Sequence, residues 1–296
     1  MSRADFTRIP PASRGFANAV RARWGTAIGS VLLHLGLTAG AVIMLLPLFW
    51  MVSAAFKPLP EILQVPPTWI PKSPSLKSFQ TVFAQMSFAR YLMNSIFVAL
   101  ITVGSVLFTS LLAGYALSKF EFRGRNFIFM AILSTMMIPF QVRLIPMYVI
   151  TYQLKLVNTY TGLILPGAVD AFAIFMMRQY MRSVPNELID AARIDGASEP
   201  GILFRIVAPL CGPALSALAI FTFSGNWESF IWPLTVTNTD NMLTLPIGLS
   251  KFSGRYLMRY DLTMAAAAIS VAPVLLFFLI LQRRFIEGIA LTGLKG

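Results

Sequence analysis

Residues 91–118 read YLMNSIFVALITVGSVLFTSLLAGYALS, and none of these 28 side chains carries a charge. About 20 apolar residues in a helix suffice to cross the hydrocarbon core of a bilayer, so this stretch is long enough to span a membrane. The chain contains three further uncharged runs of this kind, Trp24–Phe56, Ile206–Trp227 and Leu262–Gln282. Residues 126–177 are broken by charged side chains but leave room for two more spans. The sequence therefore predicts six transmembrane helices.

The composition agrees with this interpretation. Hydrophobic residues make up 56% of the chain and charged residues 12%, and the mean hydropathy is +0.70. Ordinary soluble domains carry about 25% charged residues. We therefore expect an all-α polytopic membrane protein with a tail over residues 1–25 and one transmembrane domain over residues 26–296. The expected helices are 26–52, 91–117, 126–147, 159–178, 206–227 and 263–282.

Proline positions indicate where the backbone departs from these helices. Six prolines between residues 57 and 89 predict an external loop, because proline lacks an N–H donor and breaks helices. Residues 235–261 form the second expected external loop. In the helix 126–147, Pro139 and Pro146 are expected to kink the outer half.

The formal net charge of +12 sets the expected orientation. If the N-terminus is cytoplasmic, 15 of the 24 basic residues fall in the tails and internal loops. This is the distribution that the positive-inside rule describes, and it explains the basic balance better than a nucleic-acid partner would. We expect both termini in the cytoplasm and no role in binding nucleic acid.

One polar segment interrupts the apolar sequence, at about residues 183–209. It begins Pro185-Asn186-Glu187-Leu188-Ile189-Asp190-Ala191-Ala192-Arg193-Ile194-Asp195-Gly196-Ala197. Pro185 and Glu187 suit a helix's first turn, and Gly196 can adopt the left-handed conformation that ends a helix. Ser198 and Pro200 are expected to start the next helix. This pattern predicts a helix of about ten residues across the membrane surface, in which Ala191 and Ala192 let another backbone approach. The alternative is a plain amphipathic connector.

The spacing of this segment resembles the EAA loop of ABC-importer permeases. An acid and two alanines at 190–192 precede Gly196, and Ile206-Val207-Ala208-Pro209 follows after nine residues. Asp190 stands where the family usually has Glu, and Ala208 where a leucine is common. The resemblance extends over residues 137–296 to the carbohydrate importers, and the end of the chain, Gly288–Gly296, is similar to that of their shorter, six-helix permease. It rests on further motifs, at Met137–Val142, Asn158–Tyr160, Asp195–Ser198 and Trp227–Leu234.

This resemblance implies a pore subunit of an ATP-driven importer for a sugar or polyol in a bacterial or archaeal cytoplasmic membrane. The implied partners are a different permease subunit, a homodimeric ABC ATPase that holds ATP and Mg, an extracytoplasmic substrate-binding protein and membrane lipid. The chain itself would be neither an enzyme nor a cofactor carrier. A glycerol-phosphate importer and a secondary transporter are the alternatives. The residues expected to couple to the ATPase are Glu187, Asp190, Ala191, Ala192, Asp195, Gly196 and Ala197.

The candidates for the substrate path are Asp170, Gln141, Trp227 and Glu228. Asp170 is expected about eleven residues into the helix 159–178, roughly 16 Å deep at 1.5 Å per residue. A carboxylate at that depth is costly and should face a cavity or a partner group, so it either binds sugar hydroxyls or braces two helices. Arg143 is interpreted as reaching for the lipid headgroups. Glu228-Ser229 stands where the resembling family often has Asn followed by an acid.

Several functional classes lack the residues that they require. The sequence contains no Gly-x4-Gly-Lys-Ser/Thr phosphate loop, so ATP binding of that kind is not expected on this chain. With one cysteine and one histidine, a zinc site of the usual kind is not expected either. No pairing of a nucleophile with a base is apparent.

Overall fold

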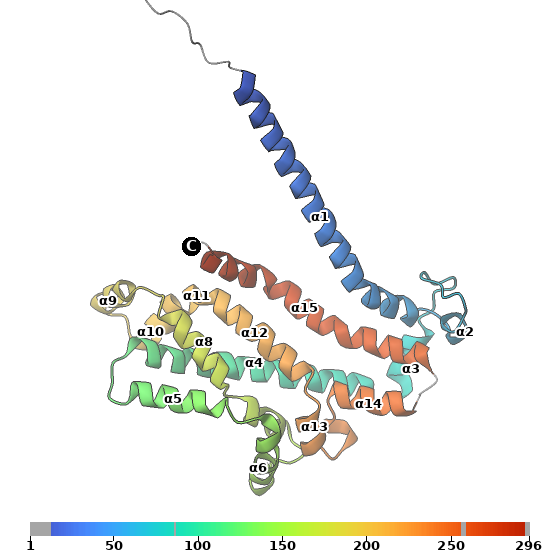
Figure 1. The fold of residues 1–296 in the computed structure, drawn as a ribbon. Helices are drawn as coiled ribbons and strands as arrows, with labels where there is room; N and C mark the ends of the chain where they lie inside the picture. The colour runs from blue at the N-terminus through green and yellow to red at the C-terminus, as the bar shows by residue number, and fades with distance from the viewer. Residues whose placement is uncertain (1–12, 86, 256–258, 294–296) are drawn as a thin grey trace, which may run out of the picture. The chain divides into compact units, whose positions relative to one another are not determined.

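The computed structural model describes residues 13–85, 87–255 and 259–293, and every element in these ranges is helical (Figure 1). The chain divides into two compact units, residues 1–53 and residues 54–296, which are described separately. The predicted boundary between a tail, 1–25, and a single domain, 26–296, stays a prediction.

The first unit contains most of helix α1 (Ser13–Ala55). This helix begins well before residue 26, where we expected it to start. From Gly29 to Ala55 it is long and apolar enough to cross a membrane, and Pro47 lies within it. His34 is locally satisfied, because its Nδ1 lies 2.7 Å from the carbonyl oxygen of Ser30 one turn earlier.

The second unit is built around α4 (Phe88–Lys119). This helix packs against α8 (Ala171–Met181) and α12 (Gly212–Trp227), and α12 packs against α15 (Tyr260–Gly293) (Figure 1). Gly114 allows α4 to approach α8 closely, since a Cβ there would lie 2.8 Å from the Cβ of Met177. α4 and residues 260–283 of α15 are also long and apolar enough to span a membrane in one piece.

The remaining spans are bent helix pairs. α5 (Arg125–Thr135) and α6 (Phe140–Gln153) meet at 99°. α7 (Tyr160–Ile164) continues into a 3-10 turn, Leu165–Gly167, and bends by 45° before α8. The run Glu199–Leu210 bends by 80° before α12; it comprises α10 (Glu199–Ile202), a π-helical turn (Leu203–Val207) and α11 (Ala208–Leu210). With each bent pair counted as one span, the described residues contain up to six spans, as predicted.

The kink expected at Pro139 is confirmed as a complete break of the helix, whereas the expectation of unbroken helices over 159–178 and 206–227 was wrong. α5 ends at Thr135, and Pro139, which cannot donate a helical hydrogen bond and adopts an extended ψ of 144°, is the N-cap of α6. Pro146, by contrast, lies inside α6 without ending it. Asp170 has an extended backbone immediately before α8, and Cys211 leaves helical geometry before α12.

The segments predicted as external loops contain short helices. Residues 57–89 include α2 (Leu59–Ile62) and α3 (Lys77–Gln85), and Pro58 and Pro60 occupy the start of α2, where proline is tolerated. Residues after α12 form α13 (Ile231–Val236), a 3-10 turn (Asp240–Met242) and α14 (Leu245–Arg255). The last helix, α15, extends beyond both predicted ends, 263 and 282.

Polar side chains tie the segment 236–245 to the helices beside it. The amide of Asn94 on α4 donates to the carbonyl oxygens of Asn241 and Leu243, each at 2.8 Å. Asn158, which has a positive φ of 61°, accepts hydrogen bonds from the backbone N–H groups of Asn238 and Thr239. The turn before α7 and the segment after α13 therefore form one hydrogen-bonded region.

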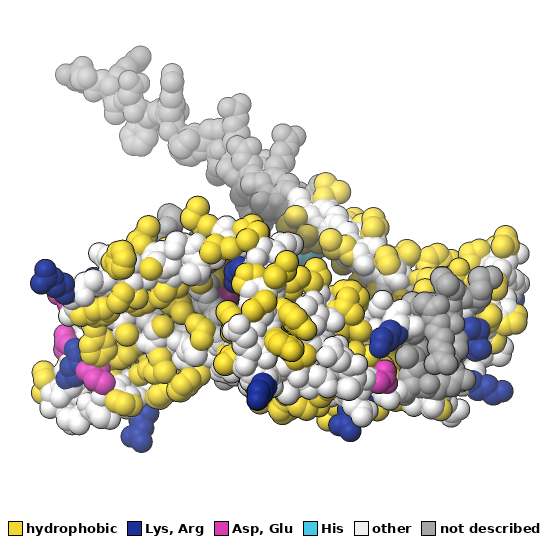
Figure 2. All heavy atoms as spheres, turned by 90° about the horizontal axis from the view of Figure 1, so that it is seen from below, with side chains coloured by type: hydrophobic (Ala, Val, Ile, Leu, Met, Phe, Trp, Pro, Cys, Tyr) yellow, Lys and Arg dark blue, Asp and Glu magenta, His cyan; other side chains and the backbone are white. Residues whose placement is uncertain are grey.

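Figure 2 shows one face of the molecule, on which apolar side chains are widespread. Charged side chains on this face are fewer and lie scattered among the apolar ones. A broad apolar surface with few charges is typical of a protein that faces lipid or other subunits.

Candidate functional site

The polar segment predicted from the sequence forms α9 (Asn186–Ile194), a nine-residue helix. It follows Pro185, whose backbone is extended, and Glu187 lies in its first turn. At its end Gly196 adopts a φ of +80°, the N–H of Gly196 donates to Arg193 O (3.0 Å), and the N–H of Ala197 donates to Ala192 O (2.9 Å). These two bonds satisfy the last carbonyls of the helix, which confirms the predicted left-handed role of Gly196.

The two faces of α9 differ in burial. Ile189 and Ala192 are buried in the same apolar cluster as residues of α4, α8 and the π-helical turn. On the other side Leu188 and Ile194 are 46% and 86% exposed, and Ala191 is exposed with them. The expectation that both alanines face a partner was therefore wrong for Ala192, because the helical period places that residue against the core of this chain.

Charged groups fix how α9 leads into the next helix. Arg193 forms ion pairs with Asp190 at 3.1 Å and with Glu199, the first residue of α10, at 2.7 Å. Ser198 takes the extended backbone of an N-cap, although its side chain makes no capping bond, and Pro200 lies in the first turn of α10. The predicted restart after Gly196 is confirmed. The exposed acids Glu187, Asp190 and Asp195 surround the apolar face.

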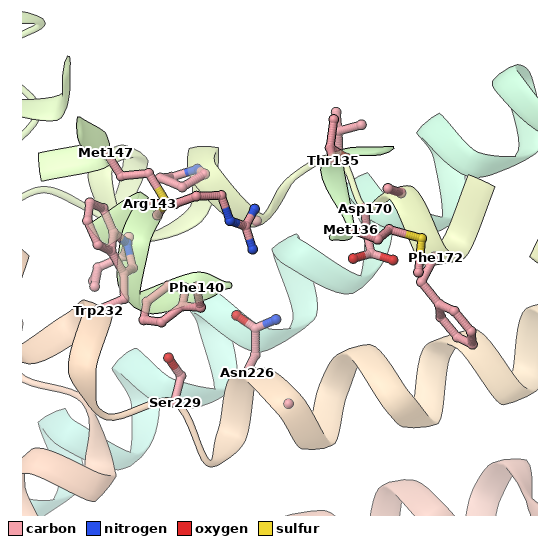
Figure 3. A pocket seen from close by; sticks show the side chains of 16 residues that line it. Thr135, Met136, Phe140, Arg143, Met147, Asp170, Phe172, Asn226, Ser229 and Trp232 are labelled. Carbon is pink, nitrogen blue, oxygen red and sulfur yellow. The ribbon is translucent and has the colours of Figure 1, made fainter. Parts of the chain in front are cut away.

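A second candidate site is a cavity of about 450 Å³ at the bends of two spans. It is bounded by the α5–α6 bend, the α7–α8 bend and the end of α12 (Figure 3). Its lining includes residues from each of these, namely Thr135, Met136, Phe140, Arg143, Met147, Leu163, Pro166, Gly167, Val169, Asp170, Ala171, Phe172, Gly225, Asn226, Ser229 and Trp232.

Polar groups of both kinds face this cavity. Figure 3 shows the Arg143 guanidinium, the Asp170 carboxylate and the Asn226 amide directed toward its middle. Asp170 also caps α8, since its Oδ1 accepts the N–H of Ala173 at 2.6 Å. Among the described residues, no ion pair joins Arg143 to Asp170. The cavity therefore offers both donors and acceptors to a polar solute.

Aromatic side chains form an apolar wall of the cavity. Trp232 is buried, and its indole N–H donates to Gly162 O at 3.2 Å, which holds the ring in place. Phe140 lies on the same side of the cavity (Figure 3). Apolar walls with a few placed polar groups are typical of small-molecule sites.

Of the four substrate-path candidates, the structure places only Asp170 in this cavity. We expected Asp170 to lie within a continuous helix. It lies instead at the N-cap of α8. Trp227 is buried, stacks on Phe223 and donates its indole N–H to Ser270 O at 3.0 Å, so its contacts are internal. Gln141 and Glu228 are exposed next to lining residues and do not line the cavity themselves.

Three lining residues were missed or read differently from the sequence. Arg143 was interpreted as reaching for lipid headgroups, yet it points into the cavity (Figure 3). Asn226 was not considered, although an amide near the end of an apolar run is a signal that could have found it. Trp232 belongs to the motif Trp227–Leu234, on which the resemblance rests, but was not among the four substrate-path candidates.

The described residues bring together no group of three or more side chains that could hold a metal ion. Their arrangement, with apolar spans, a short surface helix and a polar cavity at helix breaks, is that of a polytopic membrane transport protein. Comparison with known proteins identifies the family. Residues 105–290 match the family described as "Binding-protein-dependent transport system inner membrane component".

Individual proteins agree with this match. The chain is 39% identical over 270 residues to the arabinooligosaccharides transport system permease protein AraQ of Halalkalibacterium halodurans, covering 90% of this chain and 97% of that one. It is 38% identical over 259 residues to AraQ of Bacillus subtilis, covering 86% and 92%. In structure it resembles a bacterial ABC transporter involved in the import of the acidic polysaccharide alginate, with a TM-score of 0.75, 25% identity, and coverage of 94% of this chain and all of that chain. The chain belongs to the family of binding-protein-dependent transport system inner membrane components.

Proposed function

We propose that this chain is one of two different permease subunits of an ATP-driven importer that carries a sugar or polyol into the cell. The observation that carries the proposal is α9, a short capped helix that packs one face on its own core and leaves the other exposed. Because one face of α9 is fixed to the core of this chain, a displacement of α9 by a partner would move that core with it. The sugar substrate is supported by relatives named for arabinooligosaccharide transport.

The exposed face of α9 is the proposed contact with a homodimeric ABC ATPase. It offers Leu188, Ala191 and Ile194 as an apolar strip, with Glu187, Asp190 and Asp195 around it. Gly196 and Ala197 complete the contact, and Ala192 supports it from inside by packing on the core. ATP and Mg would be held by the ATPase, so this chain needs no cofactor of its own.

In this mechanism the ATPase moves α9, and α10, the π-helical turn and α11 carry the movement to α12. The ion pair between Arg193 and Glu199 joins α9 to α10 across the turn between them. An extracytoplasmic binding protein would deliver the substrate. One of the solved structures with this fold is an alginate ABC transporter in complex with an alginate pentasaccharide-bound periplasmic protein, with a TM-score of 0.59 and 14% identity.

The substrate would pass the cavity between the helix breaks. Its donors and acceptors, on Arg143, Asp170 and Asn226, suit hydroxyl groups, and Trp232 with Phe140 suits the apolar face of a sugar ring. Gln141 and Glu228 lie next to it and would meet the solute only on entry or exit.

The experiment that tests this function is reconstitution in liposomes. The chain is co-expressed with its partner permease, ATPase and binding protein, and the purified complex is supplied with ATP and a series of labelled sugars. We expect uptake of at least one sugar that depends on ATP and on the binding protein. Purification of the chain without any nucleotide-binding partner, or uptake driven by an ion gradient alone, would contradict the proposal and favour a secondary transporter.

Both termini are proposed to lie in the cytoplasm, with residues 57–89 outside. In a Cys211→Ala background, cysteine at position 75 should react with an impermeant thiol reagent on intact cells, and cysteine at position 13 should not. The reverse labelling pattern would invert the topology.

A glycerol-phosphate importer is a second candidate, favoured by one observation. Arg143 places a guanidinium in the cavity without an ion pair to Asp170, and guanidinium groups bind phosphate well. Including glycerol phosphate among the solutes in the uptake assay decides between the two.

A further inference from the structure

The end of α4 that is proposed to lie in the cytoplasm contacts the first residue of α9 and the first residue of α10. Tyr115 and Lys119 lie one turn apart on α4, so their side chains share a face of the helix. Lys119 donates to the carbonyl oxygen of Val184 and, at 2.8 Å, to Oδ1 of Asn186, at the beginning of α9. The Tyr115 hydroxyl donates to Oε2 of Glu199 at 2.7 Å, just beyond its end.

Glu199 is the junction of these contacts. Its two carboxylate oxygens have different partners: Oε1 accepts from Nε of Arg193 on α9, and Oε2 accepts from Tyr115 on α4. Tyr115 is 4% exposed, and its ring packs edge-on against Phe120 with centroids 5.4 Å apart. The Arg193 guanidinium lies 5.9 Å from the centroid of the same Phe120 ring. Hydrogen bonds to charged groups are among the stronger ones, so this cluster resists being pulled apart.

Between this end and the cavity, α4 contacts α8 and the turn before it directly, without α12 as an intermediate. At Gly114 the backbone of α4 lies against Met177 and Arg178 of α8, too close for any side chain. Farther along α4, the Thr109 side chain reaches Ala168, with its Oγ1 3.3 Å from Ala168 O, although the shortest hydrogen bond of this hydroxyl, at 2.8 Å, goes to Ser105 O within α4. Ala168 lies between the cavity-lining residues Gly167 and Val169, close to Asp170. A shift of α4 would therefore carry the wall of the cavity with it.

We propose that Tyr115, acting through Glu199, is a positioning residue that makes α4 a second lever for the movement of α9, beside the direct route through α10 and α12. This inference rests on the proposed function, because it assumes that α9 receives the movement of the ATPase. It goes beyond that function in assigning two parallel routes to the pore and in naming the hydroxyl that joins one of them.

The test uses Tyr115→Phe in the complete reconstituted complex. The substitution keeps the ring and its packing on Phe120 and removes only the bond to Glu199. We expect complex assembly, the maximal ATPase rate and the apparent KM for substrate to stay unchanged. Uptake per ATP hydrolysed should fall about tenfold, which corresponds to a coupling of about 1.4 kcal/mol.

Tyr180→Phe is the matched control. Tyr180 lies on α8 at the edge of the same apolar cluster, and its hydroxyl has no hydrogen-bond partner among the described residues. It should keep the wild-type uptake per ATP. The variant Glu199→Gln, alone and combined with Tyr115→Phe, completes a cycle in which the two losses should be strongly non-additive if both act through one bond.

The outcomes separate this inference from the function on which it rests. Wild-type coupling in Tyr115→Phe would overturn the second lever alone. A loss that merely follows a lower assembly yield or melting temperature would overturn it as well, because the hydroxyl would then be structural. A wild-type complex that hydrolyses ATP without any uptake would overturn the proposed function and the second lever together.

Discussion

α9 and the cavity before α8 both depend on helix ends, but they use them in different ways. In α9 the end is satisfied by its own backbone, through the bonds from Gly196 and Ala197, so its side chains are free to form a surface. At the cavity two helix bends and the end of α12 converge, and the capping group of α8, Asp170, is itself a lining group. The exposed side chains of α9 can therefore be substituted without loss of the helix. At the cavity, by contrast, the Asp170 carboxylate both caps α8 and supplies polarity, so a substitution there affects the fold and the site together.

The largest effect should come from two adjacent alanines on opposite faces of α9. Ala192→Arg places a guanidinium among Ile189 and other buried residues, where an unpaired charge costs several kcal/mol, so we expect no assembled complex. Ala191→Arg alters only the exposed face and should leave assembly intact while uptake is lost. Size-exclusion yield and uptake are measured for both variants. Failure of Ala191→Arg to assemble would show that the two faces are not distinct.

The contrast between these regions also explains what could be predicted from the sequence. α9 was predicted nearly in full, because Pro185, Glu187 and Gly196 act on the residues next to them. Only the predicted exposure of Ala192 was wrong. Which face of α9 is buried depends on the core beneath the helix, and the residues next to Ala192 in sequence do not reveal it. The six spans were predicted because bilayer thickness sets their length.

The cavity could not be assembled in this way. Pro139 and Pro166 signal departures from helix geometry, but their sequence positions do not give bends of 99° and 45°. Arg143 and Asn226 come from segments far apart in the sequence, and only packing places them together. Asp170 was recognised because an acid in an apolar run is costly, whereas its role as the N-cap of α8 required the break to be known.

Asp170 gives the next largest effect and separates its two roles. Asn caps helices about as well as Asp, so Asp170→Asn should keep the fold of α8 and remove only the charge from the cavity. We expect uptake to fall about tenfold with ATPase activity and assembly retained. Asp170→Ala should in addition lower stability by about 1 kcal/mol, because the cap is lost. If Asp170→Asn transports normally, the charge has no place in the substrate path.

Gly196 and Gly124 offer a smaller, matched comparison. Both have positive φ angles, +80° and +90°, and a Cβ on either would meet no atom within 4 Å. Alanine at either position should therefore cost a similar amount of stability, about 1–2 kcal/mol. Only Gly196→Ala strains the end of α9, so it alone should reduce uptake per ATP. Equal losses in both variants would mean that the effect is general destabilisation.

The smallest effect concerns Glu61, whose carboxylate lies outside the spans and stabilises the turn over residues 61–72 by hydrogen bonds. Its Oε1 accepts the backbone N–H of Lys72 at 2.8 Å and the Thr68 hydroxyl at 3.2 Å. The bond from Lys72 is the main reason that the pKa of Glu61 lies below its ordinary value in the folded protein.

Because this folded-state pKa is lowered, Glu61 stabilises the fold above its ordinary carboxyl pKa, and that stability is lost as pH falls through the lower value. The melting temperature of the complex should therefore decline on acidification below about pH 4.5 more steeply in the wild type than in Glu61→Gln. Thr68→Val removes the weaker of the two bonds and should give an intermediate slope. This turn resembles the cavity in depending on a contact between residues that are not neighbours in sequence, here eleven residues apart. It resembles α9 in lying at a surface. Identical slopes in all three proteins would mean that the carboxylate of Glu61 adds nothing to the fold beyond what a neutral amide supplies.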